Sequence, residues 1–247
     1  MEFKSKNILI LGGNSDVAKC LALDFARLGS NLILTERKNG QLAKFSNELE
    51  SNFDITCKIK FLDIIDFKSH NDFFNETKEN ISIVVSCIGF LDEQKKSEID
   101  FKQCLNSIQT NYTGLVSILN LYANHFENNN FGTIVGLSSV AGERGRVTNY
   151  IYGSAKAGFT VYLSGLRNRL FKKGVNVITI IPGFIMTKMT AHLPLNKFLT
   201  VNPADVSLVI INSIKRNKDI VYVHTLWRFI MIIIRNIPEF FFKKTHL

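Results

Sequence analysis

Asn7-Ile-Leu-Ile-Leu-Gly-Gly-Asn-Ser-Asp-Val-Ala18 decides the fold, because an apolar run of strand length leads through two glycines into a helical pattern. Gly12 and Gly13 allow a ligand to approach the backbone closely, and the free amides at the start of a helix attract phosphate. The segment therefore predicts a strand, a phosphate-binding turn and a first helix. The plainer alternative is a tight turn in which Ser15 or Asp16 caps that helix.

Short apolar runs alternate with longer helical patterns over the rest of the chain. We expect strands at 7–11, 31–34, 55–62, 81–86, 132–137, 175–180 and 220–223, and helices at 16–28, 40–50, 67–78, 101–110, 111–126, 150–172 and 203–215. The sequence therefore predicts an α/β fold, a doubly wound parallel sheet of about seven strands with helices on both faces. Because no linker interrupts the pattern, residues 1–225 are interpreted as one domain, followed by a tail at 226–247.

The composition fits a globular protein with a large core. The chain has 247 residues, 46% of them hydrophobic and 21% charged, and its formal net charge is +9. Such an excess of cations suits nucleic acid, an anionic membrane surface or phosphate-bearing ligands. The basic residues are dispersed and no RNA-binding signature accompanies them, so nucleic acid is not expected as a partner.

Cysteine and histidine positions argue against a disulfide framework and a metal site. Cys20, Cys57, Cys87 and Cys104 are widely separated and the histidines are scattered, so reduced thiols and no bound metal are expected. The N-terminus lacks the apolar stretch of a signal peptide, and no run reaches the roughly 20 apolar residues of a membrane-spanning helix. These features predict a cytoplasmic protein.

Tyr152 and Lys156 lie four positions apart in a predicted helix, so both side chains can face one substrate atom. Ser139 precedes Tyr152 by thirteen residues. A phenol, an ammonium group and a hydroxyl in this arrangement can act together on one carbonyl oxygen. Tyr150 is a less suitable candidate, because the residue four positions after it is Ser154. The pattern therefore indicates Tyr152, Lys156 and Ser139 as a catalytic set.

Thr35-Glu36-Arg37 ends the second predicted strand, where the adenosine end of a dinucleotide would lie. Glu36 could accept hydrogen bonds from a ribose, whereas Arg37 could bind a 2′-phosphate. Because both side chains are present, the sequence leaves NADH and NADPH open. Asp63, after the third predicted strand, could cap an adenine pocket or simply begin a turn.

With these motifs in order, the chain resembles the short-chain dehydrogenase/reductase family over nearly its whole length, which implies a Rossmann-type fold and an NAD(P)H cofactor. The resemblance matches Asn111-Tyr-Thr-Gly114 to the family's N-x-x-G motif and Pro182-Gly183 to its Pro-Gly motif. It implies catalytic roles for Asn111, Ser139, Tyr152 and Lys156. The cofactor contacts that it implies are Gly12, Asn14, Ser15, Asp16, Val17, Glu36, Arg37, Asp63, Ile64, Cys87, Gly89, Tyr152, Lys156, Pro182, Gly183, Ile185 and Thr187.

Two motifs depart from the family's pattern. Asp16 and Ala18 stand where the glycine motif of the family has its later glycines. Ser86-Cys87-Ile88-Gly89 replaces the Asn-Asn-Ala-Gly of the family. Because the replacements are still fairly small, we expect altered cofactor contacts and retained binding.

The resemblance implies that Tyr152 is the general acid in the reduction of a carbonyl group. A nearby ammonium group favours the phenolate, so Lys156 is expected to lower the Tyr152 pKa from about 10 and to bind the nicotinamide ribose. Ser139 would donate a hydrogen bond to the carbonyl oxygen, and Asn111 would help to hold a water for proton relay. The segment 184–202 is expected to cover the substrate, with apolar contacts from Met186, Met189 and Leu193.

Three further stretches, 138–144, 187–193 and 227–244, resemble the reductase subunits of decaprenylphosphoryl-β-D-ribose 2-epimerases. That resemblance implies a lipid-linked 2-keto sugar as substrate, a flavoprotein oxidase as partner and a place in cell-wall or glycan biosynthesis. The alternatives are a generic ketone or 3-oxoacyl-lipid reductase and a non-catalytic cofactor-binding scaffold.

The tail combines an apolar run, 226–234, with the aromatic and basic segment Phe240-Phe-Phe-Lys-Lys244. Arg228 and Arg235 are seven positions apart and share one helical face. This pattern suits a helix that lies in the inner face of a membrane, with Trp227 and the phenylalanines inserted among the lipids. The alternative is that the tail packs between the subunits of a homo-oligomer.

Overall fold

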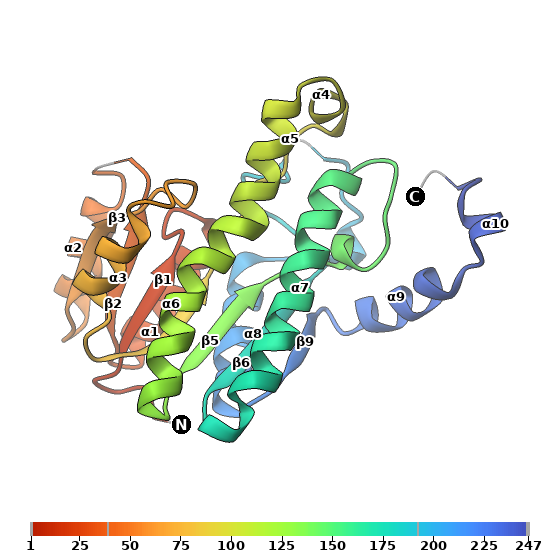
Figure 1. Ribbon diagram of the computed structural model, residues 1–247. Coiled ribbons are helices and arrows are strands. Elements are labelled where there is room, and N and C mark those ends of the chain that lie inside the picture. Colours follow the sequence, from red (N-terminus) through yellow and green to blue (C-terminus); the bar gives the residue numbers. More distant parts are fainter. Residues whose placement is uncertain (1, 39, 192, 246–247) are drawn as a thin grey trace.

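The computed structural model describes residues 2–38, 40–191 and 193–245. Met1 and residues 246–247, the ends of the predicted domain and tail, lie outside this part of the chain. Among the described residues, seven parallel strands form one sheet in the order β3-β2-β1-β4-β5-β6-β9 (Figure 1). The strands are β1 (Asn7–Leu11), β2 (Asn31–Glu36), β3 (Cys57–Phe61), β4 (Ile81–Ser86), β5 (Thr133–Leu137), β6 (Asn176–Pro182) and β9 (Ile220–Val223). The predicted fold class is confirmed.

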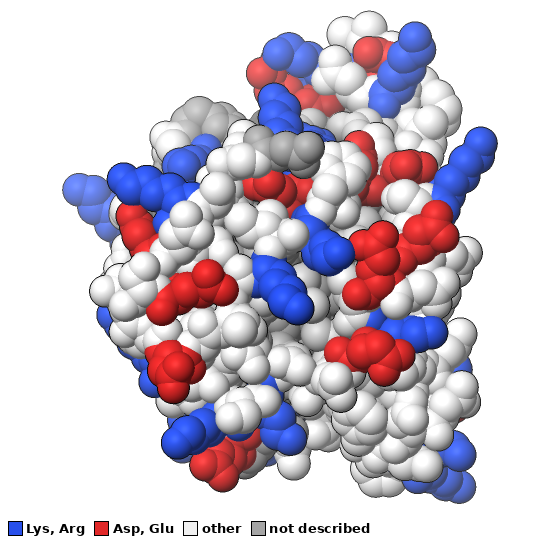
Figure 2. Space-filling model, turned by 90° about the vertical axis from the view of Figure 1, so that its left-hand side faces the viewer, with Lys and Arg blue, Asp and Glu red and all other residues white. Residues whose placement is uncertain are grey.

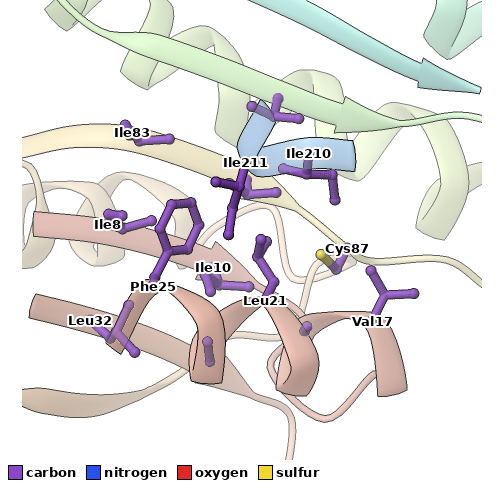
Figure 3. Close-up of a cluster of buried hydrophobic side chains, with 14 of the residues drawn as sticks. Ile8, Ile10, Val17, Leu21, Phe25, Leu32, Ile83, Cys87, Ile210 and Ile211 are labelled. Carbon is purple, nitrogen blue, oxygen red and sulfur yellow. The ribbon is translucent and has the colours of Figure 1, made fainter. Parts of the chain in front are cut away.

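Helices cover both faces of the sheet. One face packs against α1 (Asp16–Arg27), α2 (Ala43–Asn52) and α8 (Pro203–Lys215), and the other against α3 (His70–Thr77), α6 (Gly114–Asn129) and α7 (Tyr150–Leu170). In the first core, Leu21 and Phe25 of α1 lie between the strands and Ile210 of α8 (Figure 3). Burial of such side chains stabilises the fold by about 1.5–3 kcal/mol each.

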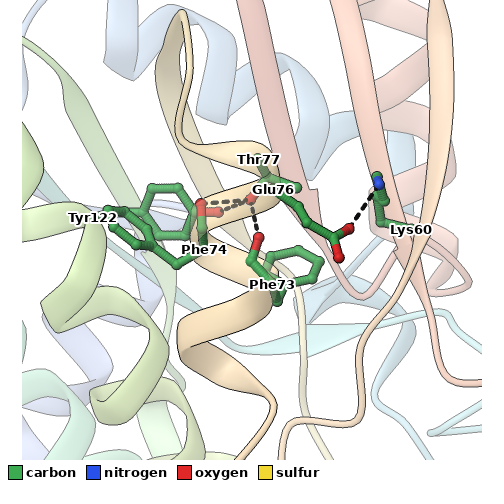
Figure 4. Close-up of polar contacts among 6 residues, drawn as sticks. All are labelled: Lys60, Phe73, Phe74, Glu76, Thr77 and Tyr122. Carbon is green, nitrogen blue, oxygen red and sulfur yellow. Dashed lines mark hydrogen bonds and ion pairs between the residues drawn. The ribbon is translucent and has the colours of Figure 1, made fainter.

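The second core includes one buried polar contact. The Tyr122 hydroxyl on α6 meets the Thr77 hydroxyl at 2.5 Å, and Thr77 also donates to the Phe73 carbonyl (Figure 4). A buried phenol without such a partner would lose its hydrogen bonds to water uncompensated. Thr77 belongs to α3, and on the solvent side of that helix Glu76 pairs with Lys60 of β3 at 2.8 Å. These contacts fix α3 against both the sheet and α6.

The strand order creates the place for a ligand. β1 lies between β2 and β4. The strands after β1 are added toward one edge of the sheet as far as β3, and from β4 onward they are added toward the other edge. In open parallel sheets a crevice forms at the carboxyl ends of the strands where the order reverses. The loops that follow β1, β4, β5 and β6 all begin at this edge. They carry the motifs that were identified in the sequence.

The structure differs from the predicted elements in the middle of the chain. The predicted helices at 101–110 and 111–126 are α5 (Phe101–Ile108), a π-helical turn (Gln109–Thr113) and α6. A short helix, α4 (Gln94–Ile99), and a small pair of strands, β7 (Phe184–Ile185) and β8 (Thr200–Val201), were not anticipated. The π-helical turn contains Asn111, so it changes the geometry at a predicted site residue.

The tail forms α9 (Leu226–Asn236) and α10 (Glu239–Phe242), which project from the sheet edge beyond β9 (Figure 1). Trp227 is only 3% exposed, and it packs with Met231 against Val140 and Ile181. The expectation that Trp227 inserts into lipid is therefore wrong, because its indole is already buried in the protein. Among the described residues, no helix is both long and apolar enough to span a bilayer.

The charged side chains are spread over the surface. Figure 2 shows the face at the left of Figure 1, where lysines and arginines alternate with acidic side chains and uncharged surface. A nucleic-acid site requires basic residues clustered on one face. On this side of the molecule the lysines and arginines are dispersed among other side chains.

Candidate active site

One cavity of about 580 Å³ opens at the carboxyl ends of the strands. Every predicted catalytic or cofactor-binding residue lines it except Asp63 and Asn111: Gly12, Asn14, Ser15, Asp16, Val17, Glu36, Arg37, Ile64, Cys87, Gly89, Ser139, Tyr152, Lys156, Pro182, Gly183, Ile185 and Thr187. The volume lies within the range of small-molecule and cofactor sites. Residues from distant parts of the sequence are therefore brought into one site.

The turn after β1 has the geometry of a phosphate cradle. Gly12 has a positive φ of 84°, and its amide donates to the Thr35 hydroxyl at 2.8 Å. Ser15 caps α1 by accepting the Ala18 amide at 3.1 Å. Within the described residues, the amides of Asp16 and Val17 have no acceptor, as expected for the first turn of a helix. Two free N–H groups at a helix N-terminus fit a pyrophosphate.

Asp16 does not spoil this cradle, although it stands where the family has glycine. Its carboxylate accepts the Lys188 amide at 2.8 Å, so the charge is engaged by the segment that follows β7. Ala18, at the other departure, is fully buried in the core under the turn. Both departures are thus accommodated without closing the cavity.

At the predicted adenosine end, Glu36 is used by the protein itself. Its carboxylate accepts the Gly40 amide at 2.7 Å and the Leu42 amide at 3.0 Å, and the residue is buried. Arg37 and Lys38 are exposed at the cavity wall. The local charge available to a ligand is therefore positive.

Asp63 lies outside the cavity wall, and its carboxylate accepts the Ile65 amide at 3.2 Å. Asp63 was predicted either to cap an adenine pocket or to begin a turn, and in the structure it begins a turn. Its neighbour Ile64 is buried and lines the cavity instead. An apolar side chain at this point suits the face of a planar base.

Lys156 is 2% exposed, and its ammonium group donates to the Leu137 carbonyl at 3.0 Å. Burial lowers the Lys156 pKa to about 8, and the nearby Cys87 thiol opposes this shift. The ammonium lies 5.8 Å from the centre of the Tyr152 ring. Lys156 therefore keeps a largely protonated cation beside Tyr152 at neutral pH.

Burial raises the Tyr152 pKa to about 12, and the neighbouring Ser139 hydroxyl opposes the shift. The direction is opposite to the expected lowering, because desolvation of the phenolate is the largest effect and the Lys156 ammonium group is engaged by the Leu137 carbonyl. Ser139 accepts the Ala141 amide at 3.1 Å, which leaves its hydroxyl proton free to donate. Tyr152 is therefore a protonated donor at neutral pH.

Asn111 acts on the backbone and does not reach the cavity. Its side-chain amide donates to the Phe90 carbonyl at 2.6 Å and to the Ser107 carbonyl at 2.9 Å, and its oxygen accepts the Phe90 amide at 3.0 Å. Phe90 follows Gly89, which lies in the cavity wall beside Lys156. The side chain is therefore a positioning group for this loop, and the predicted water relay has no direct support from it.

Two residues that the sequence did not single out lie at the substrate end. Arg146 and Asn149 line the cavity with Tyr152, and the Arg146 Nε and the Asn149 Oδ1 are buried without a hydrogen-bond partner among the described residues. The guanidinium has one sulfur contact, at 3.4 Å to the Met231 Sδ. Burial lowers the Arg146 pKa, and Glu143 opposes that shift. A half-buried cation and an unused acceptor are therefore available to a ligand.

The segment after β7 forms the remaining wall. Met189 and Leu193 line the cavity as predicted, whereas Met186 is exposed and does not. Thr187 is held by Thr190, whose hydroxyl accepts the Thr187 amide at 3.2 Å and donates to the Ile185 carbonyl at 2.5 Å. The wall is thus apolar on one side and polar near Arg146.

Comparison with known proteins gives a consistent set of relatives. The short chain dehydrogenase family model matches residues 6–197. An uncharacterised oxidoreductase of Mycobacterium tuberculosis is 29% identical over 240 residues, which cover 96% of each chain. An NADP-dependent 3-hydroxy acid dehydrogenase of Schizosaccharomyces pombe is 24% identical, with 90% of this chain and 91% of the relative covered. A short-chain dehydrogenase from Sphingobium yanoikuyae, solved in complex with NADPH, superposes with a TM-score of 0.82 at 20% identity, covering 95% and 97% of the two chains.

Proposed function

Because this chain belongs to the short-chain dehydrogenase family, we propose that it is an NAD(P)H-dependent oxidoreductase that reduces a ketone at Tyr152. One observation carries this proposal: Tyr152, Lys156 and Ser139 line the same cavity as the phosphate cradle after β1. A cofactor held at its phosphates by the Asp16 and Val17 amides would extend along this cavity toward Tyr152. A scaffold without turnover would have no use for the three catalytic side chains together.

When bound, the reduced nicotinamide supplies the hydride for the carbonyl carbon. The residues of this chain manage the charge that develops on the carbonyl oxygen. Tyr152 gives that oxygen its phenolic proton, and Ser139 donates a hydrogen bond to it. The Lys156 cation stabilises the resulting phenolate, while its bond to the Leu137 carbonyl holds it in place.

We further propose that NADPH is the preferred cofactor. The Glu36 carboxylate, the candidate acceptor for a ribose, is occupied by two backbone amides. Arg37 and Lys38 offer exposed cations at the same end of the cavity, and cations favour a 2′-phosphate. The NADPH complex of the Sphingobium protein and the name of the Schizosaccharomyces relative agree with this choice.

Tyr152→Phe tests the reaction. The variant lacks the proton donor, so we expect turnover of a ketone to fall by about 10³-fold or more. The Kd for NADPH and for NADH, measured from the change in nucleotide fluorescence on titration with the protein, should stay within about twofold of the wild-type value. The phosphate cradle is untouched in this variant. Tyr150→Phe is the matched control and should retain full activity. Near wild-type turnover in Tyr152→Phe would remove the assignment.

We propose that the substrate is a keto sugar carried on a lipid phosphate, reduced at C2 to the arabinose epimer after a flavoprotein has oxidised the ribose. The half-buried Arg146 guanidinium supports an anionic group on the substrate, and the Asn149 oxygen can accept a hydrogen bond from a sugar hydroxyl. Met189 and Leu193 would contact apolar parts. A carboxylate would also suit Arg146, so a 3-oxo acid is the second candidate, in accord with the name of the Schizosaccharomyces relative.

Reconstitution distinguishes these substrates. The chain is combined with a flavoprotein oxidase and polyprenylphosphoryl ribose, and the product is analysed with NADPH and with NADH. We expect the arabinose epimer, and Arg146→Gln should raise the KM for this substrate by about tenfold or more while reduction of a neutral ketone changes little. No arabinose with either cofactor, while a 3-oxo acid is reduced, would replace the first candidate with the second.

A further inference from the structure

The tail helices present several large apolar side chains to solvent. On α9, Phe229 is 61% and Ile233 is 67% exposed, and Leu226 and Ile232 are exposed beside them. Phe240 and Phe241 of α10 extend the same kind of surface. We call these six residues the outer face. Soluble proteins rarely leave so many large apolar side chains together in water, so such a surface indicates a partner.

The outer face is held in place by an inner face that is also apolar but is buried against the rest of the protein. Trp227 and Met231 of α9 are buried in the protein, and the Trp227 Nε1 donates to the Leu199 carbonyl at 3.1 Å. Arg144 pairs with Glu239 and stacks on Phe242 at 4.2 Å, which fixes α10. The contacts that hold the tail on the protein are thus made by the inner face and by Arg144, and the outer face is not needed for them.

Positive charge surrounds this surface. Arg228 and Arg235 lie two helical turns apart on α9, and Lys243 and Lys244 follow α10; all four are exposed. Glu239 is the one acidic residue between 226 and 245 in the sequence, and its carboxylate is paired with Arg144. The rim of the outer face is therefore cationic and lacks compensating acids of its own.

We propose that the outer face docks on an anionic lipid bilayer. Apolar side chains enter the boundary between headgroups and acyl chains, and the surrounding cations meet lipid phosphates. A second copy of the chain is a poorer occupant, since two tails packed face to face would bring their cations together without acids between them. The proposal does not depend on the substrate or on catalysis at Tyr152.

Docking there would place the active site at the membrane. The inner-face Trp227 packs on Gly183 and Phe184, which begin the segment over the substrate end of the cavity. The inner-face Met231 contacts Arg146, which lines the cavity. The α9 helix therefore lies between cavity-lining residues and the surface that would meet lipid.

Vesicle co-sedimentation of the full-length chain tests this docking. Vesicles of phosphatidylcholine alone are compared with vesicles that also contain phosphatidylglycerol, at low and high salt. We expect pelleting with the anionic vesicles, weakened by salt because the charges are exposed. Phe229→Ser with Ile233→Ser should weaken binding by about tenfold or more through the lost apolar contact. Arg228→Gln with Arg235→Gln should reduce the preference for anionic lipid.

Val161→Ser with Phe171→Ser is the matched control, because these residues are similarly exposed but lie outside the tail. This variant should bind vesicles like the wild type. NADPH binding and thermal unfolding verify that each variant is folded. The proposal is overturned if the full-length chain pellets with neither vesicle, or if the Phe229 and Ile233 substitutions leave binding unchanged. It is also overturned if light scattering shows that these substitutions dissociate a dimer while vesicle binding is absent.

Discussion

Lys156 is a cation that the fold holds almost completely out of water, with a pKa of about 8 in place of 10.5. Because the pKa of Lys156 is lower in the folded state than in the unfolded state, burying the charged ammonium group destabilises the fold. This destabilisation is fully present below pH 8 and decreases as the pH rises toward 10.5. This difference corresponds to about 3 kcal/mol. We expect Lys156→Met to raise the free energy of unfolding by up to about 3 kcal/mol at pH 7 and by about 1 kcal/mol less at pH 9, while abolishing activity.

Urea denaturation at the two pH values measures this gain. Lys172→Met replaces an exposed lysine after α7 and should give no pH-dependent gain. A gain from Lys156→Met that is as large at pH 9 as at pH 7 would contradict the burial of a charged ammonium group. Stability and activity oppose each other at this residue, as is common where an active site holds a strained or desolvated group.

At this scale the sequence predicted which residues meet, and was less successful with what each one does. The spacing of Ser139, Tyr152 and Lys156 was sufficient to place them in one cavity. The role of Glu36 depends on the path of the following loop, whose amides take both carboxylate oxygens. Arg146 carries no motif, and only its buried, unpartnered Nε distinguishes it from a surface arginine.

At the scale of elements, α9 is attached mainly through two buried side chains, Trp227 and Met231, of which Trp227 is the larger. A Cβ on Gly183 would overlap the Trp227 indole, so the absence of a side chain there makes room for the tail. We expect Trp227→Ala to lower stability by about 3–5 kcal/mol and to release α9. Hydrogen exchange of the α9 amides would then approach that of an unprotected segment.

Phe229→Ala is the control on the same helix. Its side chain is exposed, so the variant should change stability by less than about 0.5 kcal/mol. Equal losses in the two variants would mean that Trp227 does not anchor the helix. Rapid hydrogen exchange of the α9 amides in the wild-type protein would also mean that Trp227 does not anchor the helix.

Most element boundaries could be predicted, because strands and helices differ in apolar period. β1, β4, α8 and β9 begin and end where the sequence indicates. The π-helical turn at 109–113 could not be predicted, because it accompanies a tertiary contact in which Asn111 bonds both Phe90 and Ser107. The contact of α9 with Gly183 was missed for the same reason, since it joins residues far apart in the sequence.

At the scale of the whole molecule, the alternation of elements was enough for the sheet and for the edge at which its site forms. The strand order follows from parallel pairing with right-handed connections, which leaves few alternatives. The position of the tail relative to the cavity does not follow from those rules. It depends on contacts among side chains from β6, β9 and α9, which are far apart in the sequence.

The hydrogen bond from the Lys188 amide to Asp16 joins two parts of the cavity rim that are 172 positions apart. One part carries the turn that fits the cofactor phosphates, and the other covers the substrate end. A movement that opens one part therefore strains the other. Through this hydrogen bond we expect the entry and departure of the two ligands to be kinetically linked.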